Sequence, residues 1–421
     1  MSMNWPIAFV QLFFTLGWTV YVIFLPGLLK LAGIDLSWLP WILIVDQLLF
    51  AAADLATGVW FDRSAEWLRK AANALTVLVL LSCAIFVTLP LMVQSSPAWV
   101  FVLALFIWVI CSSVLRVPPL AMLAKFATPS QPATLHTPVA AYLFGLGVAG
   151  ALAPYLTVLL KNRDPMLPFV VASISLAVAT LVLRRALVKA GSVSSPPTAP
   201  SLPSSPISNI AFAAPLLIAV GLFAAGMQIH AGVNSAKLFT KVAPGVSLEW
   251  LMPLFWAGFS VAMFPASVWL TRRAERDANP HAPPANALWL AGVLGGMALV
   301  GCAMQPMLPT LIALQIIAGA LWAVVLLAAI TSATLIGRSG REGGWIGATM
   351  ALLALATVGR IALALVISPG NNENPGRQIA DLLPWISGTA WLLAAGTMVI
   401  VVMRRRGDGT DPRVSVTAKR K

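Results

Sequence analysis

Twelve long apolar segments dominate this sequence and restrict it to one kind of fold. A helix needs roughly 20 predominantly apolar residues to cross the hydrocarbon core of a bilayer. Of the 421 residues, 59% are hydrophobic and 10% are charged, whereas soluble domains carry about 25% charged residues. We therefore predict an all-α polytopic membrane protein with twelve transmembrane helices. The spans lie near residues 6–30, 38–61, 71–94, 98–121, 135–160, 165–186, 209–239, 247–271, 286–304, 309–336, 345–368 and 379–403.

Basic residues gather on one side of these spans. An even number of spans puts both termini on the same side, and the connecting loops then form two sets. The set that includes the C-terminal tail holds 19 of the 27 Lys and Arg residues, and the opposite set holds six. Because basic loops stay in the cytoplasm, we expect both termini to be cytoplasmic, in a cell inner (plasma) membrane. The net charge of +13 then serves topology and contact with the lipid bilayer, and no nucleic acid is expected as a partner.

The sequence lacks the residue patterns that mark an enzyme or a metal site. It has no phosphate-binding glycine loop, no Ser/His/Asp set and no HExxH motif. Cys83, Cys111 and Cys302 fall inside spans, without a CxxC pair or a Cys/His cluster. We therefore expect no catalytic residues, no metal and no cofactor. The first apolar segment has no basic residue before Lys30 and no small-residue cleavage site, so we expect it to be retained as a span.

A stretch rich in proline and serine divides the spans into two equal sets. Residues 189–208 contain too much proline and serine for a packed element, which predicts a flexible cytoplasmic linker. Six spans precede it in residues 1–188, and six follow it in residues 209–403, before a basic tail at residues 404–421. Two six-helix bundles joined in this way suit a carrier whose halves rock about a central site.

The loop after the second span carries the most informative local motif. Residues 58–70 read Gly-Val-Trp-Phe-Asp-Arg-Ser-Ala-Glu-Trp-Leu-Arg-Lys. This stretch resembles the loop between helices 2 and 3 of major facilitator transporters, and the resemblance implies the major facilitator fold. In such a carrier the glycine lets two helices approach closely, and charged residues of the loop lock the two halves together. The residues with this expected role are Gly58, Asp62, Arg63, Arg69 and Lys70.

Within that superfamily, the second span is similar to the glycoside-pentoside-hexuronide cation symporters. Their second helix carries an aspartate, a glycine four residues on, Asp-Arg, a short polar run, a tryptophan and two basic residues. The residues that match this order are Asp54, Gly58, Asp62, Arg63, Trp67, Arg69 and Lys70. A second family motif, at the end of the fourth span, is matched more loosely, with Pro119 and Lys125 in place of a tyrosine and a glutamate. The resemblance implies cation-coupled symport of a small organic solute.

Charged residues within the N-terminal spans are candidates for ion coupling. Asp54 lies eight residues before Asp62, and Arg116 lies nine residues before Lys125, so both sit at similar depth in their spans. A charge within a span costs at least about 2.5 kcal/mol and usually faces the bundle interior or a water-filled cavity. Asp54 either binds and releases a proton beside Arg116, or forms with it a fixed ion pair that holds two helices. Asp46 is a second candidate for proton coupling, or a hydrogen-bond partner of a helix end.

The C-terminal half has its own polar positions within spans. Arg360 has no acidic neighbour in sequence, so it either meets an anionic substrate or pairs with a backbone carbonyl or Asp381. The seventh span is interrupted by glycines, which allow local unwinding. Its Gln228, His230 and Asn234 are candidate substrate-binding residues. Histidine changes charge near neutral pH, so His230 either senses protons or is a hydrogen-bonded core residue.

One face of the first span is semi-polar. Gln11, Thr15, Trp18 and Tyr21 recur at spacings of three and four residues, which places them on one side of a helix. Trp18 and Tyr21 suit stacking against an organic solute, and Gln11 suits hydrogen bonding to it. Ordinary packing between helices explains the same pattern, so both interpretations stay open.

These patterns favour a secondary active transporter that moves a small organic solute by alternating access. We expect coupling to protons or another cation, and a monomer as the working unit. A rival hypothesis is a non-transporting protein of the same fold that assists assembly of a membrane complex, which would need no Asp54, Arg116 or His230 beside a cavity. A polytopic membrane enzyme, the third possibility, would need a catalytic cluster at one membrane face.

Overall fold

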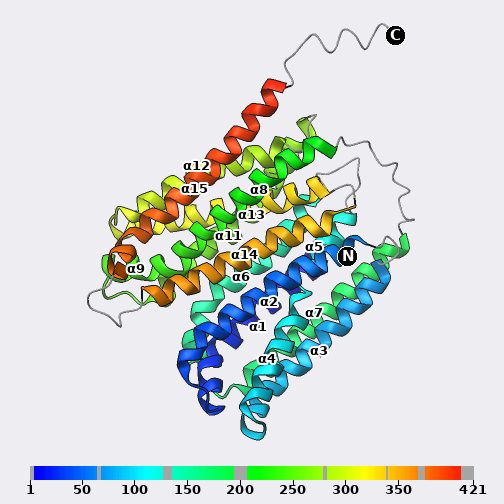
Figure 1. Ribbon diagram of the computed structural model, residues 1–421, viewed down its shortest axis with the longest axis vertical. Coiled ribbons are helices and arrows are strands. Elements are labelled where there is room, and N and C mark those ends of the chain that lie inside the picture. The colour runs from blue at the N-terminus through cyan, green and yellow to red at the C-terminus, as the bar shows by residue number, and fades with distance from the viewer. Residues whose placement is uncertain are drawn as a thin grey trace.

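The structure is a computed structural model that describes residues 4–63, 68–126, 135–193, 206–277, 282–337, 340–367 and 375–408. Within these residues, twelve helices are long and apolar enough to cross a membrane. The twelve predicted spans are therefore confirmed, and their ends lie within several residues of the predicted ones. Figure 1 shows the long helices lying side by side along one common direction.

The N-terminal half contains the first six spans. Its helices are α1 (Asn4–Leu31), the short 3-10 helix η1 (Leu36–Trp38), α2 (Leu39–Asp62), α3 (Leu68–Ser95), α4 (Ala98–Ser113), α5 (Pro118–Phe126), α6 (His136–Leu160) and α7 (Met166–Val193). Helices α4 and α5 together form the fourth span. The last residues of α7 occupy the start of the predicted linker, and residues 194–205 lie outside the described part of the chain.

The C-terminal half contains the other six spans. Its helices are α8 (Pro206–Ile229), the π-helical turn η4 (His230–Asn234), α9 (Ser235–Val242), α10 (Leu248–Leu251), α11 (Pro253–Arg276), α12 (Ala282–Ala303), α13 (Leu308–Gly337), α14 (Glu342–Val366) and α15 (Pro375–Asp408). Helix α8, η4 and α9 form the seventh span, and α10 with α11 forms the eighth. Helix α15 continues four residues beyond Arg404, where the basic tail was expected to begin.

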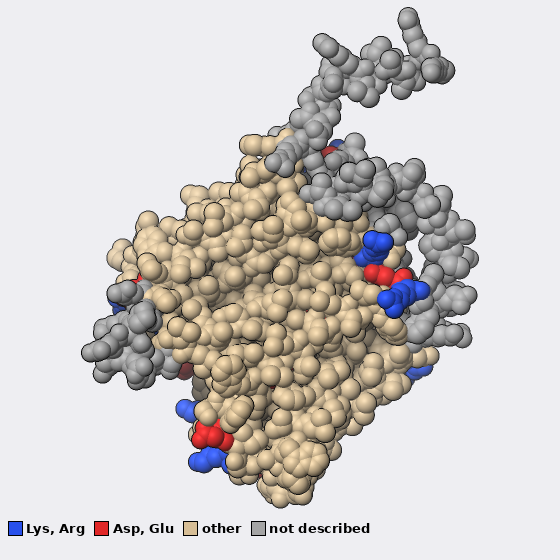
Figure 2. Space-filling view, viewed as in Figure 1, with Lys and Arg blue, Asp and Glu red and all other residues tan. Residues whose placement is uncertain are grey.

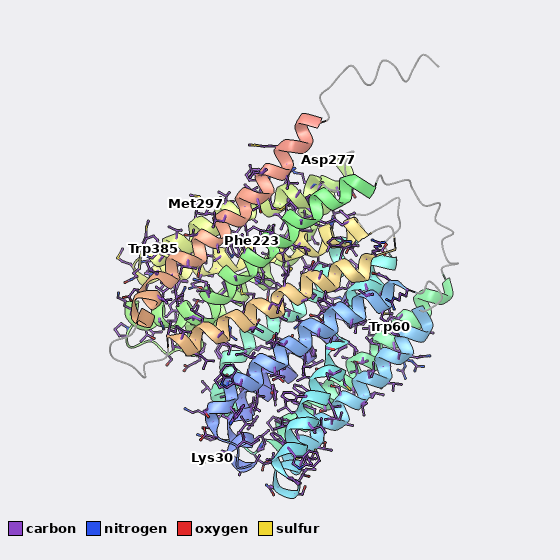
Figure 3. The ribbon with its side chains drawn as sticks, in the orientation of Figure 1. Lys30, Trp60, Phe223, Asp277, Met297 and Trp385 are labelled. Atoms are coloured by element: carbon purple, nitrogen blue, oxygen red, sulfur yellow. The ribbon has the colours of Figure 1, made fainter. Side chains whose placement is uncertain are left out.

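The two ends of the helix bundle are named here by residues that they hold. Lys30 and Trp385 lie at one end, and Trp60 and Asp277 lie at the other (Figure 3). Helix α1 starts and α15 ends at the Trp60 end, which we call the termini face, and we call the opposite end the Lys30 face. Charged side chains in Figure 2 lie toward these two ends, with an uncharged band between them. Large apolar side chains within the spans, such as Val261 and Met297, are 76% and 61% exposed, as contact with lipid requires.

Two pairs of helices make the most extensive contacts between the halves. Helix α2 packs along α14, and α6 packs along α11. At the α2–α14 seam, a Cβ atom added to Gly58 would collide with the backbone of Gly343, and one added to Gly347 would collide with the carbonyl of Asp54. Glycine is therefore required at these positions for the two backbones to touch, as in other close helix crossings in membranes.

The fourth and seventh spans are not regular α-helices. The fourth was predicted as one helix over residues 98–121, but it breaks between Ser113 and Pro118. Pro118 and Pro119 lack the N–H groups that would continue the hydrogen-bond ladder, so the helix stops and restarts with Pro118 in its first turn. The seventh was predicted to unwind, and it widens instead into the single π-helical turn η4, in which the Ser235 N–H donates to the His230 carbonyl.

Candidate functional site

A cavity of about 200 Å³ lies between the two halves, near the middle of the spans. Its polar lining residues are Gln11, Thr15, Gln47, Arg116, Gln228 and Thr357. Its aromatic lining residues are Phe14, Trp18, Phe50, Tyr142, Trp256 and Trp322. Pockets for drug-sized ligands measure roughly 300–1,000 Å³, so this cavity suits a smaller solute. The lining offers such a solute both apolar surface and hydrogen-bonding groups.

Asp54 and Arg116 form an ion pair at the edge of this cavity. The Arg116 Nη2 atom lies 3.0 Å from Asp54 Oδ2, and Arg116 Nε donates to Asp54 Oδ1 and Oδ2 at 3.2 and 3.1 Å. Asp54 is fully buried, whereas 17% of the Arg116 side chain is exposed. The two residues that were predicted to lie at similar depth in their spans are therefore in contact. The arginine stays accessible from the cavity.

The break in the fourth span positions Arg116. The residue lies in the turn between α4 and α5, where the prolines leave backbone carbonyls without helical donors. The buried hydroxyl of Tyr142, on α6, donates to the carbonyls of Leu115 and Arg116 at 3.2 Å each. Tyr142 therefore satisfies the Leu115 carbonyl, which Pro119 leaves without a donor, and holds the turn that carries the guanidinium.

Arg116 also contacts the C-terminal half directly. Its Nη2 donates to the carbonyl of Met350, on α14, at 3.2 Å. Its guanidinium carbon lies 4.8 Å from the ring centroid of Phe50, a distance suited to a cation–π contact. One side chain of the N-terminal half therefore joins a buried carboxylate of its own half to the backbone of the other half.

Asp62 closes the α2–α14 seam at the termini face. The N–H groups of Gly343 and Gly344 donate to Asp62 Oδ1 and Oδ2, each at 2.7 Å. These N–H groups belong to the first turn of α14, where a carboxylate is stabilised by unpaired donors and by the helix dipole. Arg63 is exposed. Residues 64–67 lie outside the described residues, as do the side chains of Arg69 and Lys70.

Asp46 lies inside the N-terminal half and not in the cavity wall. It is fully buried, and the hydroxyl of Tyr21 donates to its Oδ2 at 2.7 Å. Its Oδ1 has no hydrogen-bond partner among the described residues. Tyr21 packs between Trp18 and Trp108, with ring centroids 5.0 and 4.8 Å away. Of the predicted stripe on the first span, three members line the cavity and Tyr21 turns away from it.

The polar residues of the seventh span face two directions. Gln228 lines the cavity and donates to Thr357 of α14 at 2.8 Å. His230 is buried in the C-terminal half, with its Nε2 3.1 Å from Gln315 Oε1. Asn234 is also buried there, and its side chain donates to Ser387 at 3.1 Å. The candidate substrate residues His230 and Asn234 therefore lie behind the cavity wall.

Arg360 lies on the same face of α14 as Thr357, one helical turn nearer the Lys30 face, and it is not itself a lining residue of the cavity. Residues spaced by three and four along a helix share a face, and Leu353 and Thr357 of that face line the cavity. The Arg360 side chain crosses Gly232, where an added Cβ would collide with the Arg360 Cδ. No carboxylate of the described residues, Asp381 included, forms an ion pair with Arg360. The Arg360 Nε also has no hydrogen-bond partner among the described residues.

Several cavity residues were not identified from the sequence. Tyr142, Trp256 and Trp322 line the wall, but a tryptophan in an apolar span looks the same in sequence whether it faces lipid or a cavity. Gln47 had a readable signal, because it is an uncharged polar residue in the middle of a span, next to Asp46.

Comparison with known proteins gives structural matches only. No family model matches this chain, and no curated protein matches its sequence. The structure is similar to that of a bacterial homologue of the iron transporter ferroportin in an outward-facing state. The TM-score is 0.69, at 15% sequence identity over 95% of this chain and 99% of that chain.

Two further solved structures extend the match. The major facilitator superfamily transporter FucP, a fucose:proton symporter of E. coli, in an outward conformation gives a TM-score of 0.59 at 13% identity, over 93% of this chain and 97% of its own. The human organic anion transporter MFSD10 (TETRAN) gives 0.57 at 14% identity, over 95% of this chain and 98% of its own. This chain therefore has the major facilitator fold, with twelve transmembrane helices in two six-helix bundles.

Proposed function

We propose that this chain is a secondary active transporter, in which proton binding at Asp54 is coupled to movement of a small organic solute by alternating access. The observation that carries the proposal is the bridge made by Arg116, which pairs with Asp54 of α2 and bonds to the Met350 carbonyl of α14. The bridge borders a cavity at mid-span, where carriers of this kind bind substrate. A charge site and a solute site thus share one residue that touches both halves.

The coupling follows from the charge of Asp54. While Asp54 is ionised, it holds the guanidinium of Arg116 in place against α14 by charge-assisted hydrogen bonds. Protonation neutralises the carboxyl group and removes this attraction, so Arg116 loses its anchor in the N-terminal half. The α2–α14 seam then opens more readily at the termini face, which shifts the population toward the alternative state.

The roles of the other residues follow from their places. Gln11, Trp18 and Gln228 contact the solute, whereas Tyr21, His230 and Asn234 support the wall from behind. Gly58 and Asp62 close the seam at the termini face, and the basic residues Arg63, Arg69 and Lys70 follow them in the sequence. With the termini face in the cytoplasm of the inner membrane, the present state is closed on the cytoplasmic side. The motif at residues 54–70 supports a relationship to the glycoside-pentoside-hexuronide symporters. Cation coupling in that family supports coupling to a cation in this chain.

The test is accessibility of a cysteine placed behind the closed seam. The native cysteines Cys83, Cys111 and Cys302 are buried and are replaced by serine, and Ala121→Cys is added in α5, where Ala121 is fully buried. A membrane-impermeant maleimide is applied to the termini face at mildly acidic and mildly alkaline pH, with labelling normalised to denatured protein. We expect labelling to rise at acidic pH, and Asp54→Asn to label strongly at both pH values.

Asp46→Asn is the matched control. It removes another fully buried carboxylate of the same helix, but one whose described hydrogen-bond partner, Tyr21, lies in the same half. We expect this variant to keep the pH response of the parent protein. Two results would favour the static assembly factor over the proposed carrier. One is a labelling rate of the parent protein that does not change with pH, and the other is an Asp54→Asn variant whose labelling rate still changes with pH.

A further inference from the structure

Arg360 is a cation in the membrane-spanning part of the C-terminal half that no described protein group neutralises. Arginine stays protonated in proteins, and a charge at this depth carries a free-energy cost unless a partner compensates it. Asp381, the acidic partner that the sequence suggested, is exposed and does not pair with it. The Nε atom is buried and lacks a hydrogen-bond acceptor among the described residues.

The backbone of the seventh span is shaped to hold this side chain. At Gly232, in the π-helical turn η4, an added Cβ would lie 3.0 Å from Arg360 Nε and 3.3 Å from Nη1, and it would collide with Cδ. The turn is fixed by the Ser235 hydroxyl, which donates to the His230 carbonyl at 3.0 Å. Single π-helical turns are frequent at functional sites. The side chain lies across this glycine, whereas a cation that merely escaped the bilayer would extend freely toward the helix end.

The position of Arg360 relative to the cavity indicates where a ligand could meet it. One turn toward the termini face, Gln228 and Thr357 line the cavity and bond to each other. Gly232 follows Gln228 by four residues, and Arg360 follows Thr357 by three, so both extend the cavity-facing surfaces of their helices by about 5 Å toward the Lys30 face.

We propose that Arg360 binds an anionic group of the transported solute, a carboxylate, sulfonate or phosphate, at the Lys30-face end of the cavity. This inference rests on the proposed transport function and names the substrate class for it. The anion supplies the acceptor that Nε lacks, and the planar guanidinium offers two parallel N–H groups to it. The remainder of the solute then lies in the cavity, against Trp18, Trp256 and the side chain of Gln228.

The test is thermal unfolding of the purified full chain in a neutral detergent, at fixed pH and ionic strength, with anionic and neutral compounds of matched shape. The pairs are benzoate and benzamide, succinate and succinamide, glucuronate and glucose, and glycerol 3-phosphate and glycerol. We expect at least one anion to raise the unfolding temperature more than its neutral partner. Arg360→Gln should lower the binding affinity for that anion by roughly tenfold or more, and Arg360→Lys should lower it less.

Lys237→Gln is the matched control, because it removes one positive charge from the same half of the protein, at an exposed site on α9 that does not line the cavity. We expect it to leave the anion titration unchanged. The proposal is overturned if no anion exceeds its neutral partner, if Arg360→Gln keeps the full response, or if phosphatidylglycerol added to the micelles is the only anion that stabilises the protein. A pH response at Ala121→Cys that persists in any of these cases keeps the transport proposal and removes only the anionic substrate.

Discussion

Arg116 and Arg360 both lie within spans, one in each half, and their surroundings differ. Arg116 has a carboxylate, a backbone carbonyl and an aromatic ring as partners. Arg360 lies across a glycine, and its buried Nε lacks a partner among the described residues. An arginine is thus neutralised by the protein in the N-terminal half, whereas in the C-terminal half it has no counter-ion among the residues that the structure describes.

This difference indicates two separate tasks. A buried ion pair is weak evidence for stability, since well-packed apolar residues often replace it without loss. Its retention beside a cavity, with one member bonded to the other half, fits a charge that must be switched on and off. A cation without a protein partner fits a ligand that brings the opposite charge. The contrast therefore supports the two roles that we propose, coupling for Arg116 and substrate recognition for Arg360.

The largest expected effect separates the two arginines by stability. Arg116→Gln leaves the fully buried Asp54 without its cation, and breaking a buried pair in this way costs about 3–5 kcal/mol. Arg360→Gln removes a cation that has no carboxylate partner in the described structure, so the free energy of unfolding should hold or rise. Thermal unfolding of both variants without added ligand measures this contrast.

The double variant Asp54→Asn with Arg116→Gln is the control for this contrast. It removes both charges, so it should unfold at a higher temperature than either single variant, each of which leaves one group unpaired. Equal losses for Arg116→Gln and Arg360→Gln would show that Arg360 has a structural partner. That result would erase the difference between the two sites.

Much of the fold could be predicted from the sequence, because the thickness of the bilayer is a one-dimensional constraint. The lengths of the apolar segments predicted all twelve spans. The same counting along the helices predicted that Asp54 and Arg116 lie at one depth, and they do pair. Depth is readable because each residue of a helix advances by a fixed rise.

Direction around the helix axis was harder to predict, because it depends on how each helix is rotated against its neighbours. Trp18 and Tyr21 share a stripe in the sequence, yet Trp18 lines the cavity and Tyr21 turns to Asp46. The break before Pro118 was readable, because consecutive prolines remove two helical donors. The hydrogen bond that the Tyr142 hydroxyl donates to the carbonyl of Arg116, 26 residues away in the sequence, was not readable, because it depends on tertiary packing.

A second prediction concerns the seam that the Arg116 bridge crosses. Gly58→Ala places a methyl group against the backbone of Gly343, and such overpacking costs about 1–3 kcal/mol in a well-packed interface. The α2–α14 seam should loosen, and Ala121→Cys should label more strongly from the termini face. Gly359→Ala is the matched control, since an added Cβ meets no atom within 4 Å there. Equal labelling of the two variants would mean that the seam does not depend on the contact at Gly58.

The smallest expected effect distinguishes a helix cap from a pair of opposite charges at the termini face. Asp62→Asn keeps one acceptor oxygen for the first turn of α14 but loses the negative charge, which is worth about 1 kcal/mol at a helix N-terminus. That free energy corresponds to a shift of about fivefold in the ratio of closed to open states, measured as faster labelling of Ala121→Cys. Arg63→Gln is the matched control, because Arg63 is exposed and the cap does not need it. If Arg63→Gln speeds labelling as much as Asp62→Asn does, then closure at the termini face depends on the charge of Arg63 as well. The seam that the Arg116 bridge crosses would then be held by a pair of opposite charges in addition to the helix cap.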